Sequence, residues 1–362
     1  MGKNRKLIDL ADKFAITGDA CEVSELGNGL INDTYLVETT EGHKYVLQRI
    51  NHNVFRDIAG LQHNIATITS HLRNKYIARG MNDIDRRVVS LIQLRDGKAT
   101  WIEADGEFWR MISYIDRSKT LEEVNPSTAE AAGLAFGRFE ADLSDLETPL
   151  IETIPDFHNM ELRLCQLREA IAADPVGRAA EVSDILDKIN DRAERMTAGE
   201  RLVRAGRLKK RPCHCDTKVN NMLFDENSDE VLCVIDLDTV MLSTVFSDYG
   251  DFLRTGACTA PEDEPDTEKV GIDMEIFKAF TKGYIEGTRG FLTETERKML
   301  PHAAALFPYM QAVRFLTDYI NGDTYYRTRY DKHNLVRTLA QIKMLESVEA
   351  HSKEMEEYIS RL

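Results

Sequence analysis

The chain has 362 residues, of which 43% are hydrophobic, so it is long enough to form more than one folded core. Its 61 acidic residues outnumber its 46 basic ones, and a net charge of −15 argues against nucleic acid and against an anionic membrane surface as partners. The six cysteines form no Cys-x-x-Cys pair, and no apolar run approaches the roughly 20 residues of a membrane span, so we expect free thiols and a cytoplasmic protein.

The first third of the chain is predicted to form a small antiparallel sheet with one helix. Alternating apolar residues predict strands, and apolar residues at three-and-four spacing predict a helix over residues 53–76. The expected strands lie at residues 20–26, 33–39, 44–50, 88–93, 99–103 and 108–115. Because a polar stretch follows the last strand, we expect an N-terminal nucleotide-binding lobe over 1–115, a hinge over 116–120 and a second lobe over 121–362.

Two glycines lie in the turn between the first two predicted strands. Gly27, Asn28 and Gly29 would let backbone N–H groups approach an anion closely, as in a loop that covers the phosphates of a nucleotide. A plain hairpin turn is the alternative, because a single Gly-x-Gly is a weak signal by itself. The position of the turn between two strands near the N-terminus favours the nucleotide.

Helical periodicity dominates the chain after residue 127. The expected helices cover residues 127–143, 158–172, 178–205, 273–286, 293–320 and 333–361. Between them, apolar runs at 222–224 and 231–235 flank a turn-forming segment, which predicts a β-hairpin. A small sheet, a linker and a helical lobe that carries a hairpin indicate an α+β, bilobal, protein-kinase-like fold.

The segment HCDTKVNN at residues 214–221 carries the clearest chemical signal. Asp216 and Asn221 have the spacing of a kinase catalytic loop, in which the Asp accepts the proton of the acceptor hydroxyl and the Asn holds magnesium. His214 is expected to brace this loop. Asp248 and Asp251 are expected to accept backbone hydrogen bonds near it.

The predicted hairpin suggests a second magnesium ligand. If its turn is centred between residues 228 and 229, Asn221 lies opposite Asp236, and opposed residues have Cβ atoms only about 4.5–5.5 Å apart. An amide oxygen and a carboxylate at that separation could share one Mg²⁺. Asp238 points to the same strand face and is the alternative ligand, but the pairing favours Asp236.

These residues resemble the aminoglycoside phosphotransferase and choline kinase superfamily, which shares the protein-kinase-like fold. Within it the chain is similar to bacterial N-acetylhexosamine 1-kinases, through blocks at residues 32–37, 45–48, 216–221, 235–239, 314–319 and 333–338. Enzymes of that kind transfer a phosphoryl group from ATP to the anomeric hydroxyl of GlcNAc or GalNAc. The resemblance therefore implies ATP, Mg²⁺ and a small sugar acceptor.

The resemblance also implies which residues contact the sugar. These are Asp216, which is also the base, together with Arg314, Tyr325 and Asn32. From the residues alone, Arg314 is as readily a salt-bridged helix arginine, and Tyr325 as readily a packing aromatic.

The chain departs from the expected pattern at several positions. Gln48 stands where a protein kinase carries its third-strand lysine, and the following helix has only Asp57 as an acid, so both halves of the usual ion pair are missing. We place Gln48 at the nucleotide site and assign the lost positive charge to Lys218, two residues after the base. Leu30 and Thr255 replace residues expected in the hexosamine kinases, which leaves the exact sugar open.

Two other functions remain open at this stage. The first is a kinase of another small alcohol, such as an aminoglycoside, choline, homoserine or methylthioribose. The second is a pseudokinase that binds nucleotide without catalysis, which only the missing ion pair supports.

Overall fold

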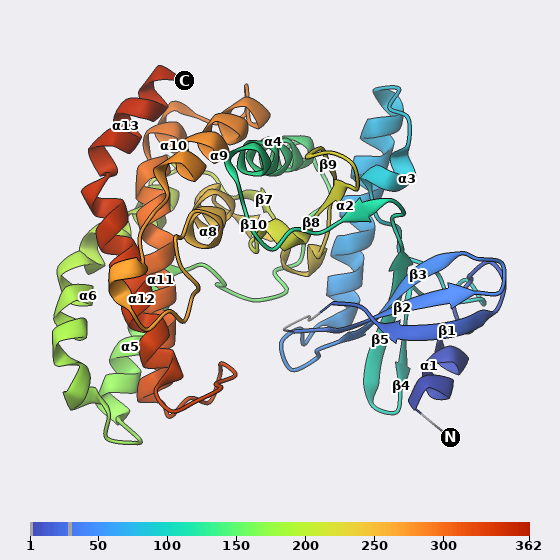
Figure 1. The fold of residues 1–362 in the computed structure, drawn as a ribbon, viewed down its shortest axis with the longest axis horizontal. Coiled ribbons are helices and arrows are strands. Elements are labelled where there is room, and N and C mark those ends of the chain that lie inside the picture. The colour runs from blue at the N-terminus through green and yellow to red at the C-terminus, as the bar shows by residue number, and fades with distance from the viewer. Residues whose placement is uncertain (1–2, 28–30) are drawn as a thin grey trace. The chain divides into compact units, whose positions relative to one another are not determined.

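The computed structural model describes residues 3–27 and 31–362, which form two compact units (Figure 1). Unit 1 comprises Met1–Lys119, Asp145–Pro155 and Leu223–Met241, and unit 2 comprises Thr120–Ser144, Asp156–Met222 and Leu242–Leu362. Asn28 and Gly29, which we assigned to nucleotide binding, and Leu30 lie outside the described residues.

Unit 1 is built on a five-stranded antiparallel sheet. Its strand order is β1-β2-β3-β5-β4, with bounds Ala20–Glu25, Asp33–Thr39, Lys44–Ile50, Glu107–Ser113 and Trp101–Ala104 in that order. Alternating residues bury one face of this sheet, and helix α1 (Lys3–Ala11) adds its apolar side chains to the same core. Helices α2 (Ile58–Ala78) and α3 (Ile84–Arg87) complete this part of the chain.

Two predictions for unit 1 need correction. Residues 88–93 form no strand of their own and contribute only an isolated bridge between Leu91 and Ile112. The helix predicted from residue 53 begins at Ile58, because Asp57 is its N-cap and accepts a hydrogen bond of 2.8 Å from the backbone N–H of Gly60. Asp57 is therefore used as a cap.

The predicted hairpin is present and contributes to unit 1. Strands β8 (Met222–Asp225) and β9 (Val231–Val234) join β6 (Ser118–Lys119) in a sheet of order β6-β8-β9. The backbone N–H of Asp225 donates to the carbonyl of Glu230 at 2.8 Å, which centres the turn one residue earlier than the symmetric hairpin we predicted. The register therefore gives no support to a pairing of Asn221 with Asp236.

Unit 2 is mainly helical. Its helices are α4 (Pro126–Leu143), α5 (Met160–Ala173), α6 (Ser183–Met196), α7 (Ala198–Arg204), α8 (Phe246–Gly256), α9 (Met274–Gly287), α10 (Glu294–Lys298), α11 (Leu300–Ile320), α12 (His333–Ala350) and α13 (Ser352–Arg361). Strands β7 (Arg211–Cys213) and β10 (Met241–Ser243) pair with each other. None of the helices described over residues 3–27 and 31–362 is long and apolar enough to span a membrane.

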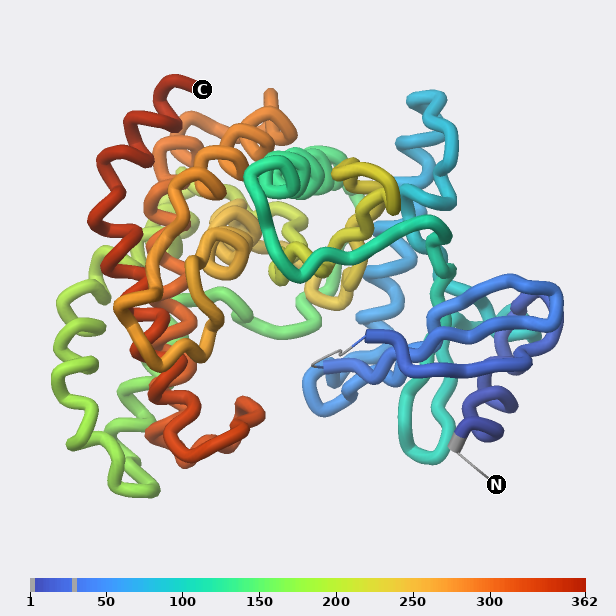
Figure 2. The backbone as a smooth tube through the Cα atoms, in the orientation of Figure 1, coloured from blue at the N-terminus to red at the C-terminus, as the bar shows by residue number. Residues whose placement is uncertain are grey.

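Three of the long helices predicted for unit 2 are divided. The breaks fall near residues 197, 299 and 351, and α11 restarts with Pro301 in its first turn, where a proline needs no hydrogen-bond partner. The backbone of residues 321–332, between α11 and α12, forms a loop that projects from the ends of these two helices (Figure 2).

Helices α4 and α9 lie against each other with almost no space between their backbones (Figure 1). A Cβ on Gly133 would lie 2.1 Å from the carbonyl oxygen of Phe280, and one on Gly283 would lie 2.0 Å from that of Glu130. Any side chain at either position would therefore force the helices apart. This packing brings the hydroxyl of Tyr284 within 2.9 Å of the carboxyl oxygens of Glu140.

Candidate active site

The loop between β7 and β8 brings three of the predicted residues together. The Nδ2 of Asn221 donates to the backbone carbonyl of Asp216 at 2.8 Å and to its Oδ2 at 3.1 Å. The Nζ of Lys218 lies 2.8 Å from the Oδ1 of the same carboxylate, and the Asp216 side chain is 23% exposed. Both oxygens of Asp216 are thus held by neighbours within the loop.

The charges of Asp216 and Lys218 support each other. Burial raises the pKa of Asp216, but Lys218, His214 and Asn221 together lower it further, so the net pKa lies below its usual range. Burial lowers the pKa of Lys218, whereas Asp216 raises it, and the net pKa lies above its usual range. The pair is therefore a carboxylate and an ammonium at neutral pH.

Helix α8 fixes the backbone of this loop. The two carboxyl oxygens of Asp248 each accept a backbone N–H at 2.7 Å, one from His214 and one from Cys215. Asp251 accepts the backbone N–H of Thr217 at 3.1 Å. These contacts confirm the structural role that the sequence predicted for the two aspartates.

Cys215, directly before Asp216, adopts a left-handed backbone conformation with φ 63°. This conformation costs a non-glycine residue about 1–2 kcal/mol, so the surrounding hydrogen bonds must hold it in place. Sequence reasoning missed this feature, because cysteine carries no signal for positive φ. The turn of the chain at Cys215 sets the direction in which Asp216 leaves the loop.

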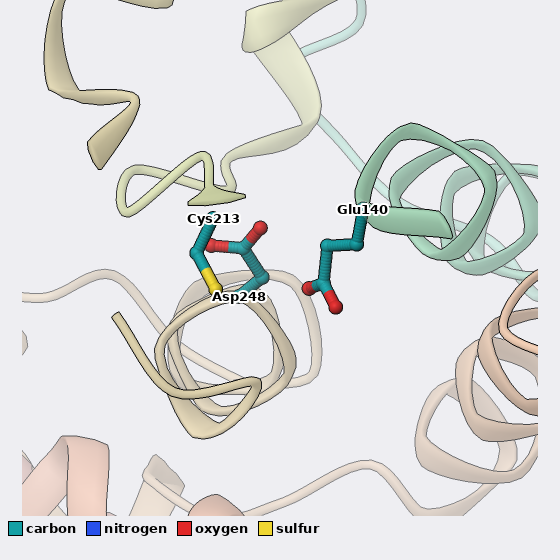
Figure 3. Close-up of side chains that lie close together, drawn as sticks. All are labelled: Glu140, Cys213 and Asp248. Carbon is teal, nitrogen blue, oxygen red and sulfur yellow. The ribbon is translucent and has the colours of Figure 1, made fainter. Parts of the chain in front are cut away.

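A buried cluster of Glu140, Cys213 and Asp248, contributed by α4, β7 and α8, lies beneath the loop (Figure 3). Their potential ligand atoms lie within 4.8 Å of one another. Burial raises the pKa of Glu140 well above its usual range, and the neighbouring Asp248 raises it further. Glu140 is therefore protonated and donates a hydrogen bond to Asp248, so a shared proton accounts for the proximity of the two carboxyl groups.

In unit 1, Gln48, which we predicted to contact the nucleotide, is hydrogen-bonded to the arginine of a buried ion pair. Gln48 in β3 pairs with Arg110 in β5, and the Nε of Arg110 donates to the Oε1 of Gln48 at 2.9 Å. The Nη1 of Arg110 lies 2.5 Å from the Oδ1 of Asp238, and both side chains are 3% exposed. Sequence reasoning missed Arg110, although a charged residue inside an apolar strand was a usable signal.

Asn32, expected at the sugar, is part of the same group of residues in unit 1. Its Nδ2 donates to the Oδ2 of Asp238 at 2.6 Å, and its Oδ1 accepts the backbone N–H of Asn51 at 2.9 Å. The side chain is buried, with 8% of the residue exposed. Both ends of the Asn32 amide thus have partners within unit 1, and none of these contacts supports a sugar-binding role.

Asp236 and Asp238, the two candidate metal ligands, differ in exposure and in the partners of their carboxylates. Asp238 is buried and its carboxylate is occupied by Arg110 and Asn32. Asp236 is exposed and begins the short turn Leu237–Thr239 in a left-handed conformation, with φ 59°. Asp236 is therefore the carboxylate that a cation could reach.

The predicted sugar residues Arg314 and Tyr325 lie in unit 2, on α11 and on the loop that follows it. The guanidinium of Arg314 lies 5.5 Å from the ring centres of both Phe157 and Tyr326. Tyr325 is 68% exposed and packs the edge of its ring against Tyr326. Tyr326, which the sequence did not single out, is thus the tyrosine beside Arg314.

Asp318 holds the loop that carries these tyrosines. Its carboxyl oxygens accept the backbone N–H groups of Thr324, Tyr325 and Tyr326 at 2.7–2.9 Å. Asn334 donates to the same carboxylate at 2.8 Å. Two of the sequence blocks, at 314–319 and 333–338, thus meet at this carboxylate.

A model of the phosphotransferase enzyme family matches residues 22–270 of the chain. An amicoumacin kinase in complex with AMP-PNP, Ca²⁺ and Ami is 15% identical, with a TM-score of 0.59, and the match covers 98% of this chain and 94% of that one. An aminoglycoside phosphotransferase from Alicyclobacillus acidocaldarius subsp. acidocaldarius DSM 446 is 12% identical, with a TM-score of 0.64 and 97% and 96% covered. A microcompartment-associated aminopropanol kinase is 14% identical, with a TM-score of 0.57 and 97% and 98% covered. These similarities confirm the predicted kinase-like fold of an antiparallel sheet lobe and a helical lobe.

Proposed function

The chain belongs to the phosphotransferase enzyme family, and from that membership we propose that it is an ATP-dependent kinase of the anomeric 1-hydroxyl of an N-acetylhexosamine, GlcNAc or GalNAc. Its products are the sugar 1-phosphate and ADP. The observation that carries the proposal is the hydrogen-bonded group of Asp216, Lys218 and Asn221, at the spacing of a kinase catalytic loop. The choice of a sugar rests on the resemblance of the sequence blocks.

Asp216 is the proposed general base. The oxygen of the acceptor hydroxyl bonds to the γ-phosphorus of ATP, the bond from that phosphorus to the bridging β–γ oxygen breaks, and ADP leaves with the electron pair. The hydroxyl proton goes to the carboxylate of Asp216. Although burial raises its pKa, Lys218 keeps this carboxylate ionised and able to accept the proton.

Lys218 is the proposed cation for the transferred phosphoryl group. It keeps its positive charge because Asp216 offsets the effect of burial on its pKa. In protein kinases a third-strand lysine provides this charge, but this chain has the neutral Gln48 at that position. Gln48 is hydrogen-bonded to Arg110 and Thr34. We keep Gln48 and Gly27 as nucleotide contacts.

Asn221 and Asp236 are the proposed magnesium ligands. The Nδ2 of Asn221 donates to Asp216, so the Oδ1 of Asn221 can bind a cation. Asp236 has an exposed carboxylate. Oxygen donors of this kind suit Mg²⁺. The ion, when bound with ATP, neutralises charge on the phosphate oxygens.

Amine-bearing alcohols are the alternative acceptors, because similar folds include an amicoumacin kinase and an aminopropanol kinase. Aminoglycosides, choline, homoserine and methylthioribose belong in the same comparison. Arg314 in unit 2 supports the sugar over the cationic acceptors among these, since a guanidinium repels an ammonium and donates hydrogen bonds to sugar oxygens. Methylthioribose carries no such charge and is distinguished only by the acceptor panel.

An acceptor panel measured by ADP release tests the proposal. We expect MgATP-dependent turnover with GlcNAc or GalNAc, abolished in Asp216→Asn and retained in Asn220→Ala, which alters an exposed residue of the same loop. Turnover of amine-bearing alcohols alone would overturn the sugar assignment. Nucleotide binding without turnover of any acceptor would favour a pseudokinase.

A further inference from the structure

Two arginines of unit 2 lie close together without an acidic partner. Arg163 in α5 donates from Nη2 to the carbonyl of Phe157 at 2.6 Å and from Nη1 to Gln166 at 2.9 Å, and its Nε is buried without a partner. Arg314 in α11 lies over the ring of the same Phe157 and donates one hydrogen bond, to Gln311 at 3.2 Å, within the part of the chain described. Neither guanidinium forms an ion pair with a described carboxylate.

Arg163 and Arg314 are half-buried, and they differ from several other arginines with little exposure, which have an acidic partner. Arg110 pairs with Asp238, Arg254 with Asp251 and Glu262, and Arg211 with Glu296. Burying a guanidinium is costly, so an arginine is ordinarily given an acid when it leaves water. Two neighbouring guanidiniums that lack one are typical of a site that receives its negative or oxygen-rich partner from a ligand.

The two arginines influence each other and the same neighbouring histidine electrostatically. The pKa of Arg163 is lowered by burial and then by Arg314, while Tyr326, Tyr325 and the exposed Asp156 act in the opposite direction. The pKa of His158 is lowered to about 3 by burial, Arg314 and Arg163, with Asp216 acting in the opposite direction. His158 is therefore neutral and lies within electrostatic reach of both the arginines and Asp216.

The neighbouring side chains give this group a fixed shape. His158 stacks on Phe157 with ring centres 4.3 Å apart, and its Nδ1 lies 3.0 Å from the hydroxyl oxygen of Ser247. Tyr326 closes the group on the side of Arg314. We call these five residues, Phe157, His158, Arg163, Arg314 and Tyr326, the arginine cluster.

We propose that the arginine cluster is a charge filter for the acceptor, in which Arg163 and Arg314 together bind an oxygen-rich neutral or anionic group and reject an ammonium. Arg163 is thereby a specificity-determining residue. The inference rests on the proposed function, since it takes Asp216 to be the base that the acceptor must reach. An ammonium placed against two half-buried guanidiniums has no counter-charge in the cluster, whereas a carbonyl or carboxylate oxygen accepts hydrogen bonds from their N–H groups.

Matched pairs of acceptors that differ only in this charge test the filter. For wild type we expect kcat/KM for N-acetylglucosamine to exceed that for glucosamine by on the order of 10²-fold at pH 7, because like-charge contact is costly. Arg163→Met should reduce this ratio roughly tenfold or more, mainly through a higher KM for N-acetylglucosamine. Arg163→Lys retains the charge and should keep most of the discrimination.

The controls separate this inference from the proposed function. Arg168→Met removes an exposed arginine from the same helix and should leave the ratio unchanged, and thermal melting checks that all variants fold. A ratio that Arg163→Met leaves unaltered would overturn the filter while the sugar kinase stands. If neither sugar is phosphorylated, the proposed function fails. The filter is then tested by comparing kcat/KM for 1,2-propanediol with that for 1-amino-2-propanol. A higher kcat/KM for the amine would overturn the filter.

Discussion

The Nη1 of Arg110 lies 2.5 Å from the Oδ1 of Asp238, and this buried ion pair joins the central sheet of unit 1 to the segment that follows β9. Asp238 is two residues after Asp236, the proposed magnesium ligand, and Thr153 and Asn32 also hold it in place. The pair thus provides a rigid support for the turn that presents Asp236. Arg110 also lies opposite Gln48 in the sheet, and Gln48 stands at the third-strand position where a protein kinase has a lysine.

Breaking this pair should destabilise the protein strongly. Arg110→Met leaves a buried carboxylate unpaired, and we expect a loss of about 3–5 kcal/mol in the free energy of unfolding. The double variant Arg110→Met with Asp238→Asn should recover part of this loss, because no charge is left unpaired. Urea unfolding measures both.

A matched control lies on the same sheet. Arg49 in β3 pairs with Asp33 at 2.5 Å, but the two side chains are 38% and 46% exposed. Arg49→Met should therefore cost only about 0–1 kcal/mol. Equal losses for Arg110→Met and Arg49→Met would contradict the importance we give to the buried pair.

Removal of Lys218 should change both the rate and its pH dependence. Lys218→Met takes away the main influence that lowers the pKa of Asp216 against burial, so this pKa should rise. The base is then protonated at higher pH, and the acidic limb of the kcat/KM profile should move upward while kcat falls by about 10² or more. Lys210→Met, at an exposed site before β7, is the control, and an unshifted limb would contradict the coupling.

Glu140→Gln should make the protein less sensitive to alkaline pH. In the unfolded chain, Glu140 ionises as pH rises above the ordinary glutamate pKa of 4.5, whereas in the folded protein its raised pKa keeps it protonated. The free energy of unfolding therefore falls as pH rises from 4.5 towards the raised folded pKa. Gln keeps the donor to Asp248 and the acceptor for Tyr284 without this titration. Its melting temperature should therefore decline less than that of wild type between pH 5 and pH 9.

Glu140→Ala is the contrasting variant for this buried pair. It removes the interaction with Asp248 and the two carboxyl oxygens that accept from the hydroxyl of Tyr284, so we expect a loss of about 1–3 kcal/mol at every pH. If the Gln variant loses stability with rising pH as steeply as wild type, the shared proton is not on Glu140.

A glycine-to-alanine pair tests the contact between α4 and α9. A Cβ on Gly283 would lie 2.0 Å from a backbone oxygen, so Gly283→Ala should cost about 1–3 kcal/mol or more. A Cβ on Gly199 in α7 would meet Phe246 at an ordinary 3.6 Å, so Gly199→Ala should be neutral or should stabilise by about 0.5–1 kcal/mol. Thermal or urea unfolding of both variants measures the difference.

Sequence reasoning predicted the elements whose signals are local. The hairpin, the placement of Asp216, Lys218 and Asn221 in one loop, and the structural aspartates of α8 all follow from short spacings and turn chemistry. The direct contacts of Asp216 with Lys218 and Asn221 were not predicted. The boundary at Asp57 was misjudged because an N-cap and a first-turn acid look alike in a single sequence.

The remaining features depend on contacts between residues distant in sequence. Nothing local links Arg110 to Asp238 or Arg163 to Arg314, since each pair is brought together only by folding. Tyr325 and Tyr326 are adjacent in the chain and both donate a backbone N–H to Asp318, yet only Tyr326 lies beside Arg314. Such choices are made by tertiary packing, which periodicity does not report.

The most direct test of the proposed kinase is the position of the transferred phosphate. The protein is incubated with MgATP and N-acetylglucosamine or N-acetylgalactosamine, and the product is examined by ³¹P NMR with coupling to the sugar protons. We predict a sugar phosphate whose phosphorus couples to the anomeric proton, together with an equal amount of ADP and no product with Asp216→Asn. Phosphate on any other hydroxyl, or transfer only to amine-bearing alcohols, would contradict the account.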